Sequence, residues 1–211
     1  MNKIDLRKKY RDFYYPPADR VSVVTVPTFQ FVMIDGRIEP GASPGNSPSF
    51  QQAMEALYGV SYSLKFMSKL RIEDPIDYTV MGLEAQWWLE EGEFDISKPD
   101  NWCWTAMIMQ PDHITESMFY AAQEKLNKKK SNPGIYKLRL ESFTEGLCVQ
   151  IMHIGPYSTE PATVKKMEEF ATRNGFQMQY KHHEIYIGNP LRSDPARLKT
   201  ILRHPVKTVG K

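Results

Sequence analysis

The first half of the chain opens with alternating apolar and polar positions, a period of two that is typical of strands. The alternation is weak over residues 21–26 and stops at Pro27. It is clear over residues 29–35 (FQFVMID), and Gly36 ends it. We therefore expect the first true strand at 29–35. Its face of Phe29, Phe31 and Met33 fits either a core or a pocket.

A period close to four follows and predicts a long amphipathic helix. Ser47 is the predicted N-cap and Pro48 the first helical residue. Large apolar residues then recur at every fourth position, and such a stripe drifts around the helix. One part of it should pack on a sheet, and another part is free to face a cavity. The stripe consists of Phe50, Met54, Tyr58, Tyr62, Phe66 and Leu70.

The remaining elements repeat this order. Strands are predicted at 78–88 and 102–110, and together they hold all four tryptophans. In the first of them Trp87 and Trp88 point to opposite faces, and in the second Trp102 and Trp104 share a face. A helix capped by Thr115 runs to about residue 130. The second half has predicted strands at 136–143, 145–154, 180–187 and 198–206, with a helix at 160–174 and a Pro-containing loop at 189–195.

Each half is thus predicted to contain a strand, a helix and two further strands. The sequence predicts an α+β domain of duplicated β-α-β-β units, a single pseudo-symmetric antiparallel sheet with a central groove. The single domain would span 1–211, with halves at about 21–110 and 136–207 and a linking helix at about 115–130. The duplication should bring the third elements of both halves close to this groove.

The predicted strand at 180–187 carries a carboxylate among aromatic rings. Tyr180, His182, Glu184 and Tyr186 share one face of it. An ionised carboxylate there attracts cations, as ring faces do, and a desolvated one exchanges protons near neutral pH. The same pattern also fits a hydrogen-bonded structural group or an exposed edge strand.

Composition narrows the class of protein. Lys+Arg 27 against Asp+Glu 25 gives a net charge of +2, which is too balanced to indicate a nucleic-acid or membrane partner. No signal peptide opens the sequence, and no apolar run approaches the roughly 20 residues that span a bilayer. Cys103 and Cys148 lack CxxC spacing and fit buried free thiols. We therefore expect a cytoplasmic protein.

Six runs of residues carry a resemblance to a known family, and together they cover nearly the whole chain. They are PxFxFxMIDG at 27–36, FQQAMEALYGVSYSLKF at 50–66, LEAQWW at 83–88, EGLCVQIMHIGPYSTEP at 145–161, KHHEIYIGNP at 181–190 and LKTILRHPV at 198–206. With these runs the sequence resembles the GyrI-like small-molecule-binding family, also seen as effector domains of multidrug-responsive transcription regulators. No helix-turn-helix region is recognisable, so no direct nucleic-acid binding is expected.

The resemblance implies a paired βαββ fold whose groove takes flat, often cationic aromatic compounds, and it marks Glu184 as the buried acidic residue. The double-tryptophan subgroup resembles hydrolases of cyclopropane-bearing DNA-alkylating toxins. We predict that Glu184 is catalytic and that aromatic, histidine and methionine side chains bind the substrate. These are Trp87, Trp88, Trp104, Tyr186, His182, Phe31, Met33, Tyr58, Tyr62, Phe66, Met109, Met152 and Tyr157.

In the enzyme interpretation, Glu184 orients or deprotonates a water, and a hydroxyl such as that of Tyr186, Tyr157 or Tyr136 polarises a carbonyl group. His182 or His153 would assist, although each also fits a structural role. Neither a cofactor nor a metal is expected, because the sequence has no Gly-rich phosphate loop and no metal-ligand spacing. His182 and His183 point to opposite faces of a strand, which argues against a joint metal site. Two other classes stay open: a protein that sequesters drugs or dyes without converting them, and a protein-binding module.

Overall fold

The computed structural model describes residues 3–92, 94–99, 101–129, 131–179, 181–188 and 193–209. Its main sheet has the order β6-β2-β5-β4-β8-β9, and β9 pairs again with β6, so these strands close into a barrel. Every pairing within the barrel is antiparallel. Its strands are β2 (Ser22–Arg37), β4 (Glu84–Trp88), β5 (Cys103–Gln110), β6 (Arg139–Ile154), β8 (His182–Tyr186) and β9 (Lys199–Thr208).

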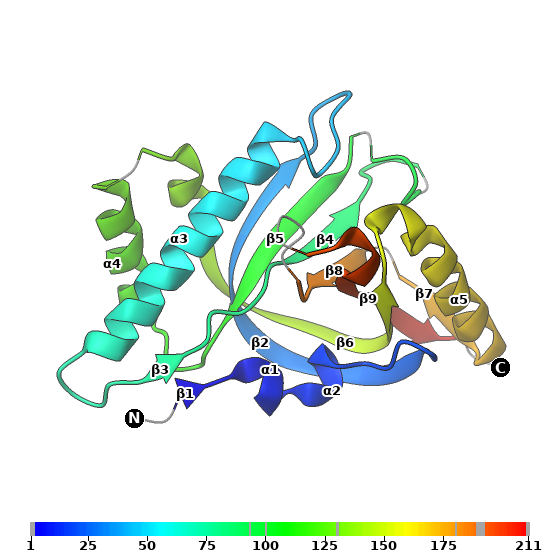
Figure 1. Cartoon of the computed structure of the whole chain (residues 1–211), viewed down its shortest axis with the longest axis horizontal. Helices are drawn as coiled ribbons and strands as arrows, with labels where there is room; N and C mark the ends of the chain where they lie inside the picture. The colour runs from blue at the N-terminus through cyan, green and yellow to red at the C-terminus, as the bar shows by residue number, and fades with distance from the viewer. Residues whose placement is uncertain are drawn as a thin grey trace.

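The predicted duplication is confirmed. The first unit is β2, α3 (Pro48–Leu70), β4 and β5, and the second is β6, α5 (Glu160–Arg173), β8 and β9. The two units meet twice, where β2 pairs with β6 and where β4 pairs with β8. Figure 1 shows α3 and α5 outside the barrel, on either side of β4 and β8.

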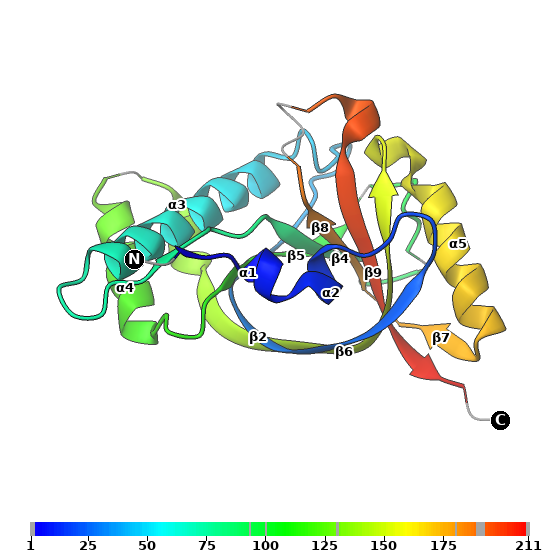
Figure 2. The same cartoon turned by 60° about the horizontal axis from the view of Figure 1, so that its bottom comes forward.

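Smaller elements surround the barrel. Helix α4 packs against α3, and the short N-terminal helices α1 and α2 lie across the curve that β2 and β6 make (Figure 2). Strand β1 pairs in parallel with β3, and β7 extends the sheet beyond β9. The bounds are β1 (Lys3–Ile4), α1 (Leu6–Lys9), α2 (Arg11–Tyr14), β3 (Asp77–Tyr78), α4 (Glu116–Asn127), η1 (Pro133–Lys137), η2 (Tyr157–Thr159), β7 (Phe176–Met178) and η3 (Pro195–Arg197).

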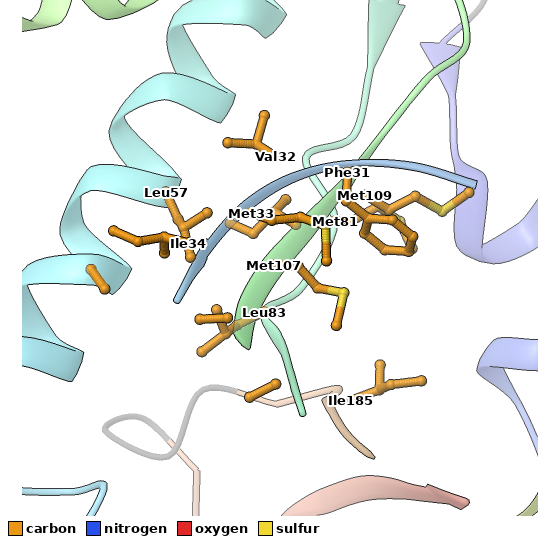
Figure 3. Close-up of a cluster of buried hydrophobic side chains, with 14 of the residues drawn as sticks. Phe31, Val32, Met33, Ile34, Leu57, Met81, Leu83, Met107, Met109 and Ile185 are labelled. Carbon is orange, nitrogen blue, oxygen red and sulfur yellow. The ribbon is translucent and has the colours of Figure 1, made fainter. Parts of the chain in front are cut away.

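In the middle of β2 both faces of the barrel wall are apolar. On β2, Val32 and Ile34 face outward to α3, and Phe31 and Met33 alternate with them and face the interior. Figure 3 shows Leu57 of α3 beside Ile34, with Phe31, Met107 and Met109 on the side of the strands away from the helix. All of these side chains are buried. One large core therefore joins the barrel interior to the space beneath α3, and a smaller cluster beneath α5 is separate; it consists of Val149, Ile151, Met167, Leu202 and Val206.

Helix α3 begins as predicted. The Ser47 hydroxyl accepts a hydrogen bond from the Phe50 backbone N–H at 3.2 Å, and Pro48 follows the cap. Its stripe drifts around the helix as expected. Phe50 is buried, whereas Tyr62 and Phe66 are each 49% exposed.

Two predicted strand breaks are wrong, and both lie at the same place. Strand β2 continues through Pro27, and β6 continues through Thr144 and through Gly146, which takes the left-handed conformation with φ of 77°. The pairs Val26–Gly146 and Thr28–Thr144 flank Pro27 in an unchanged register. Because proline lacks only its own N–H, a single rung of the ladder is lost and the strand continues.

Other element boundaries also differ from prediction. The predicted strand 78–88 is two separate strands, β3 and β4, and β7 was not predicted. Tyr180 and residues 189–192 of the predicted loop lie outside the described residues. The two cysteines are buried and free, as expected.

Gly36 permits the close approach of Trp104. A β-carbon at residue 36 would lie 2.1 Å from Cζ2 of the Trp104 ring, so the indole would have to move. We expect Gly36→Ala to lower the free energy of unfolding by about 1–3 kcal/mol, the usual cost of overpacking a core. Urea denaturation measures this loss. Gly45→Ala is the matched control, because a β-carbon there meets nothing within 4 Å. Equal stability of the two variants would contradict the prediction.

Candidate functional site

The candidate site lies on the outer face of β4 and β8, where the two units meet. Ala85 pairs with Glu184 and Trp87 pairs with His182, so all four side chains share one face of the sheet. The duplication therefore places a tryptophan strand next to the carboxylate strand, as the sequence indicated. Helices α3 and α5 flank this face (Figure 1).

Glu184 is only 6% exposed, and its carboxylate interacts with two neighbours on its own strand. The Tyr186 hydroxyl donates a hydrogen bond to Oε2 at 2.5 Å. The Nε2 atom of His182 lies 3.1 Å from Oε1. Burial, together with the Glu184 charge, raises the pKa of Tyr186 well above its ordinary value, so the phenol keeps its proton and stays a donor. The carboxylate is therefore oriented from both sides.

A second histidine continues this chain of contacts. His182 Nδ1 lies 2.6 Å from Nε2 of His204 on β9. Burial, and then the neighbouring His182, lowers the pKa of His204 well below its ordinary value, so this ring is neutral. On its other side His182 stacks on Phe94, with 5.9 Å between ring centroids. These contacts fix the plane and position of the His182 ring.

Glu160 joins the site from the first turn of α5. It is 2% exposed, and its Oε1 has no hydrogen-bond partner among the described residues. One oxygen of Glu160, one of Glu184 and a ring nitrogen of His182 all lie within 4.8 Å of one another. Burial, and then the Glu184 charge, raises the pKa of Glu160 to about 9. From its sequence position Glu160 is predicted only to begin a helix, where acidic residues are common because they interact favourably with the helix dipole.

Aromatic rings pack beside these groups. Trp87 is fully buried, with its ring centroid 5.0 Å from that of Phe50 and 5.4 Å from that of Trp102. Trp104 packs against the same Phe50 at 5.2 Å, and Phe94 against Trp102 at 4.8 Å. The indole N–H groups of Trp87, Trp102 and Trp104 are buried without an acceptor among the described residues. Such unpaired buried donors are rare in folded proteins.

The outer edge of the site is formed by Tyr157 of η2. Its ring packs edge-on against Tyr186 with 5.9 Å between centroids, and it is 39% exposed. A continuous series of contacts therefore leads from solvent through Tyr157 and Tyr186 to Glu184. Of the predicted site residues, the structure brings together Glu184, His182, Tyr186, Tyr157, Trp87 and Trp104.

Other predicted substrate-binding residues lie elsewhere. Trp88 points to the opposite face from Trp87, where the Lys181 ammonium lies 3.8 Å from its ring centroid. Tyr58, by contrast, borders the site: its hydroxyl accepts a hydrogen bond from the Leu83 N–H at 3.1 Å, and the Leu83 carbonyl accepts one from the Tyr186 N–H at 3.0 Å. Phe31, Met33, Met109 and Met152 are buried on the inner face of the barrel, away from Glu184.

Tyr62 and Phe66 line a separate hollow of about 200 Å³ between α3 and α4, together with Leu126, Lys125 and Lys129. Another hollow of about 300 Å³ lies beside α5, where it is lined in part by Ile151, His153 and Lys166. His153 is 5% exposed, and its Nδ1 lies 2.8 Å from the Thr163 hydroxyl. This histidine is thus held in place by hydrogen bonds.

A buried ionic cluster fills the barrel interior behind β8. His183 lies 2.9 Å from Glu145 and 3.2 Å from Glu84, and Arg203 lies 3.1 Å from Glu145. The Tyr14 hydroxyl donates to Glu84 at 2.7 Å and so ties α2 to the cluster. Because His183 and Glu184 are neighbours on β8, the inner cluster fixes the strand that presents the outer site.

The pKa shifts within this cluster predict that the protein is most stable in mildly acidic solution. Burial opposes both charges, but the ion pairs prevail: His183 and Arg203 lower the pKa of Glu145 to about 2, and Glu145 and Glu84 raise the pKa of His183 to about 9. The Glu145 contribution is complete above its unfolded pKa of about 4.5 and is lost toward pH 2; that of His183 is complete below about 6.5 and is lost toward pH 9.

We therefore expect the Tm to be highest between about pH 4.5 and 6.5 and to fall on either side. Calorimetry across pH 3–9 measures it. His183→Asn should lower the overall stability and remove the part of the alkaline decline that belongs to His183. An unchanged decline in this variant would contradict the assignment.

Glu160, His182 and Glu184 also have the side-chain types that ligate divalent metals. A metal among them would have to replace the contact between His182 and Glu184 and compete with the hydrogen bond from Tyr186. No helix among the described residues has the length and apolar composition to cross a membrane.

Comparisons with known proteins agree with this architecture. An uncharacterized conserved protein from Listeria innocua is 37% identical, with a TM-score of 0.87, over 97% of this chain and 100% of that chain. A hydrolase from Listeria innocua is also 37% identical, with a TM-score of 0.85, over 98% and 100% of the two chains. The EcmrR C-terminal domain shares the fold at 11% identity and a TM-score of 0.53, over 90% of this chain and 98% of that domain.

No curated protein sequence matches the chain. The family described as the GyrI-like small molecule binding domain matches residues 20–207, which is most of the sequence. The chain therefore belongs to the GyrI-like small-molecule-binding domain family.

Proposed function

We propose that the protein binds flat aromatic electrophiles on the outer face of β4 and β8 and hydrolyses them by opening a strained cyclopropane ring. The observation that carries this proposal is the buried Glu184 carboxylate, oriented by Tyr186 and His182 beside a wall of tryptophans. The similarity to a hydrolase from Listeria innocua supports an enzymatic role.

The aromatic side chains support a flat ligand that carries a hydrogen-bond acceptor. Rings such as Trp87 and Phe94 offer stacking surfaces, and indole N–H groups without acceptors are available to a carbonyl oxygen. A ligand must displace side chains to reach Glu184, since that residue is 6% exposed. Tyr157 is the exposed end of the contacts that lead there, so we expect ligand entry to move its ring.

The chemistry follows from the carboxylate. A cyclopropane conjugated to a carbonyl group is attacked by water at a ring carbon. The new O–C bond forms as a ring C–C bond breaks, and that electron pair moves onto the carbonyl oxygen. Glu184 accepts the proton from the attacking water, a role worth about 10²–10⁴-fold in rate for a positioned base. The carbonyl oxygen gains a proton, so the product is the substrate plus one water.

Cys103 and Cys148 are buried free thiols. This is consistent with a protein that functions in a reducing compartment such as the cytoplasm. The family to which the chain belongs binds small molecules, so we expect the partner of this site to be a small aromatic molecule and not a nucleic acid.

Mass spectrometry tests the proposal. Purified protein is incubated with an aromatic compound whose cyclopropane is conjugated to a carbonyl group. We expect the mass of a water adduct to appear faster than with heat-denatured protein. Recovery of intact compound at the rate of the denatured control would overturn hydrolysis for that substrate.

A second candidate function is sequestration without conversion. It is favoured by the same carboxylate, because a buried negative charge beside ring faces attracts aromatic cations. It predicts tryptophan quenching on binding, with no change in the mass of the ligand. Glu184→Gln would then weaken cationic ligands far more than neutral ligands of the same shape.

A further inference from the structure

We infer that Glu160 and Glu184 form a carboxyl pair that shares a single proton, with Glu160 as the acid and Glu184 as the base. The catalytic part of this inference rests on the function proposed above, whereas the shared proton does not. Glu160 was not among the residues that the sequence assigned to the site.

Geometry carries the pairing. Glu160 comes from α5 and Glu184 from β8, and they are 2% and 6% exposed. One oxygen of each lies within 4.8 Å of the other. Two ionised carboxylates at this separation, away from water, repel each other strongly, so one of them holds a proton.

The surroundings decide which carboxyl group is protonated. Glu184 receives the Tyr186 hydrogen bond and lies 3.1 Å from His182, and both contacts favour its anion. Glu160 Oε1 has no hydrogen-bond partner among the described residues, and the nearby Thr200 hydroxyl favours the Glu160 anion less strongly than burial and the Glu184 charge oppose it. The proton therefore resides on Glu160 and the negative charge on Glu184. The raised pKa of Glu160, caused by burial and by Glu184, agrees with this assignment.

Four neighbouring titratable groups, two tyrosines and two histidines, do not compete for this proton near neutral pH. Burial raises the pKa of Tyr157 to about 12, and burial and the Glu184 charge raise the pKa of Tyr186 well above its ordinary value. Burial lowers the pKa of His153 and of His204. Among the described residues, the titratable groups that face the pair or its immediate contacts are His182 and Tyr186 from β8, Tyr157 from η2, His153 from β6, His204 from β9 and Lys166 from α5.

The pair gives the proposed reaction a balanced path for protons. Glu184 takes the proton of the attacking water, and Glu160 gives its proton to the oxygen that receives the electron pair. After release of the product, the proton on Glu184 passes to Glu160 and the pair is restored. At neutral pH the two groups carry one negative charge together. They therefore suit a neutral ligand or a single cation, and a doubly charged cation would have to expel the proton.

Infrared difference spectroscopy tests the shared proton without any substrate. Wild-type protein should show the C=O band of a protonated carboxyl group at pH 7, and the band should disappear as the pH rises through the raised pKa of Glu160. Glu160→Gln should lack this band. Glu168→Gln, which removes an exposed carboxylate from the same helix, should retain it. Absence of the band from wild type, or its persistence in Glu160→Gln, would overturn the pairing.

Kinetics test the catalytic part with the strained-ring substrate. We expect Glu160→Gln to lower kcat at least tenfold with little change in KM, and to remove the decline of the wild-type rate at alkaline pH. Glu168→Gln should match wild type. An unchanged kcat and pH profile in Glu160→Gln would overturn its role as the acid. If wild type does not turn over the substrate, the proposed function fails, while the infrared result still decides the pairing.

Analysis of the metal content is an independent test of the shared proton. Protein purified without chelators should contain no stoichiometric divalent metal. A metal retained by wild type and lost from Glu160→Gln would overturn the shared proton, because a cation would then neutralise the pair.

Discussion

Glu184→Gln is expected to lower kcat for ring opening by about 10²–10⁴-fold, the contribution of a positioned general base. Glutamine keeps the size of the side chain and still accepts the hydrogen bond from the Tyr186 hydroxyl. It cannot take a proton from water. The loss should therefore appear in kcat, and tryptophan quenching should show that a neutral aromatic ligand still binds. Initial rates from mass spectrometry, with wild type and variant at equal concentration, give the ratio.

Two controls separate this effect from a loss of folding or of charge. The Tm of Glu184→Gln should show that the variant is folded at the assay temperature. Glu168→Gln removes one carboxylate from an exposed position on α5 and should have the wild-type rate. A Glu184→Gln variant that is folded and fully active would show that another group accepts the proton.

Arg203→Leu should lower the free energy of unfolding by about 3–5 kcal/mol, the usual cost of removing one partner from a buried ion pair. Arg203 is 2% exposed, contacts Glu145 at 3.1 Å and donates to the Gln150 side chain at 3.0 Å. It also donates to the Phe13 carbonyl at 2.6 Å, which links the barrel to α2. Leucine would leave Glu145 with His183 as its only cationic neighbour in this cluster and would leave two buried acceptors unpaired.

Urea denaturation at pH 6 measures this loss. The matched control is Arg173→Leu, where the arginine pairs with Glu169 at 3.0 Å one turn away on α5 and is exposed. Its removal should change stability by at most about 0.5 kcal/mol. A loss below about 1 kcal/mol in Arg203→Leu would show that the interior adapts to the missing charge.

Periodicity predicted the repeat well because each unit carries its own strands and helix. The alternation along β8 also placed His182, Glu184 and Tyr186 on one face, as the structure has them. Alternation could not tell which face is the inside of a barrel, since both faces are buried: Phe31 and Val32 are 3% and 0% exposed. For that reason Phe31 and Met33 were assigned to the site although they lie in the interior.

The place of Glu160 in the site could not be predicted from the sequence. Its distance to Glu184 depends on how α5 crosses β8, and residue spacing along either element does not contain that information. The apolar stripe on α3 also depends on contacts with another element. Its drift predicted that some residues leave the core, but the hollow against α4 that Tyr62 and Phe66 line depends on the position of Leu126, more than fifty residues later.

Closure of the barrel also has a consequence for biosynthesis. Ser22 pairs with Gln150, and β6 pairs with both β2 and β9, so the ring forms only when nearly all of the chain has been made. Until then the nascent first unit has two unpaired strand edges, β2 and β4. Pairings between such distant residues form slowly, and open edges are prone to wrong associations. Folding during translation should therefore wait for the second unit, whose arrival completes both the barrel and the site.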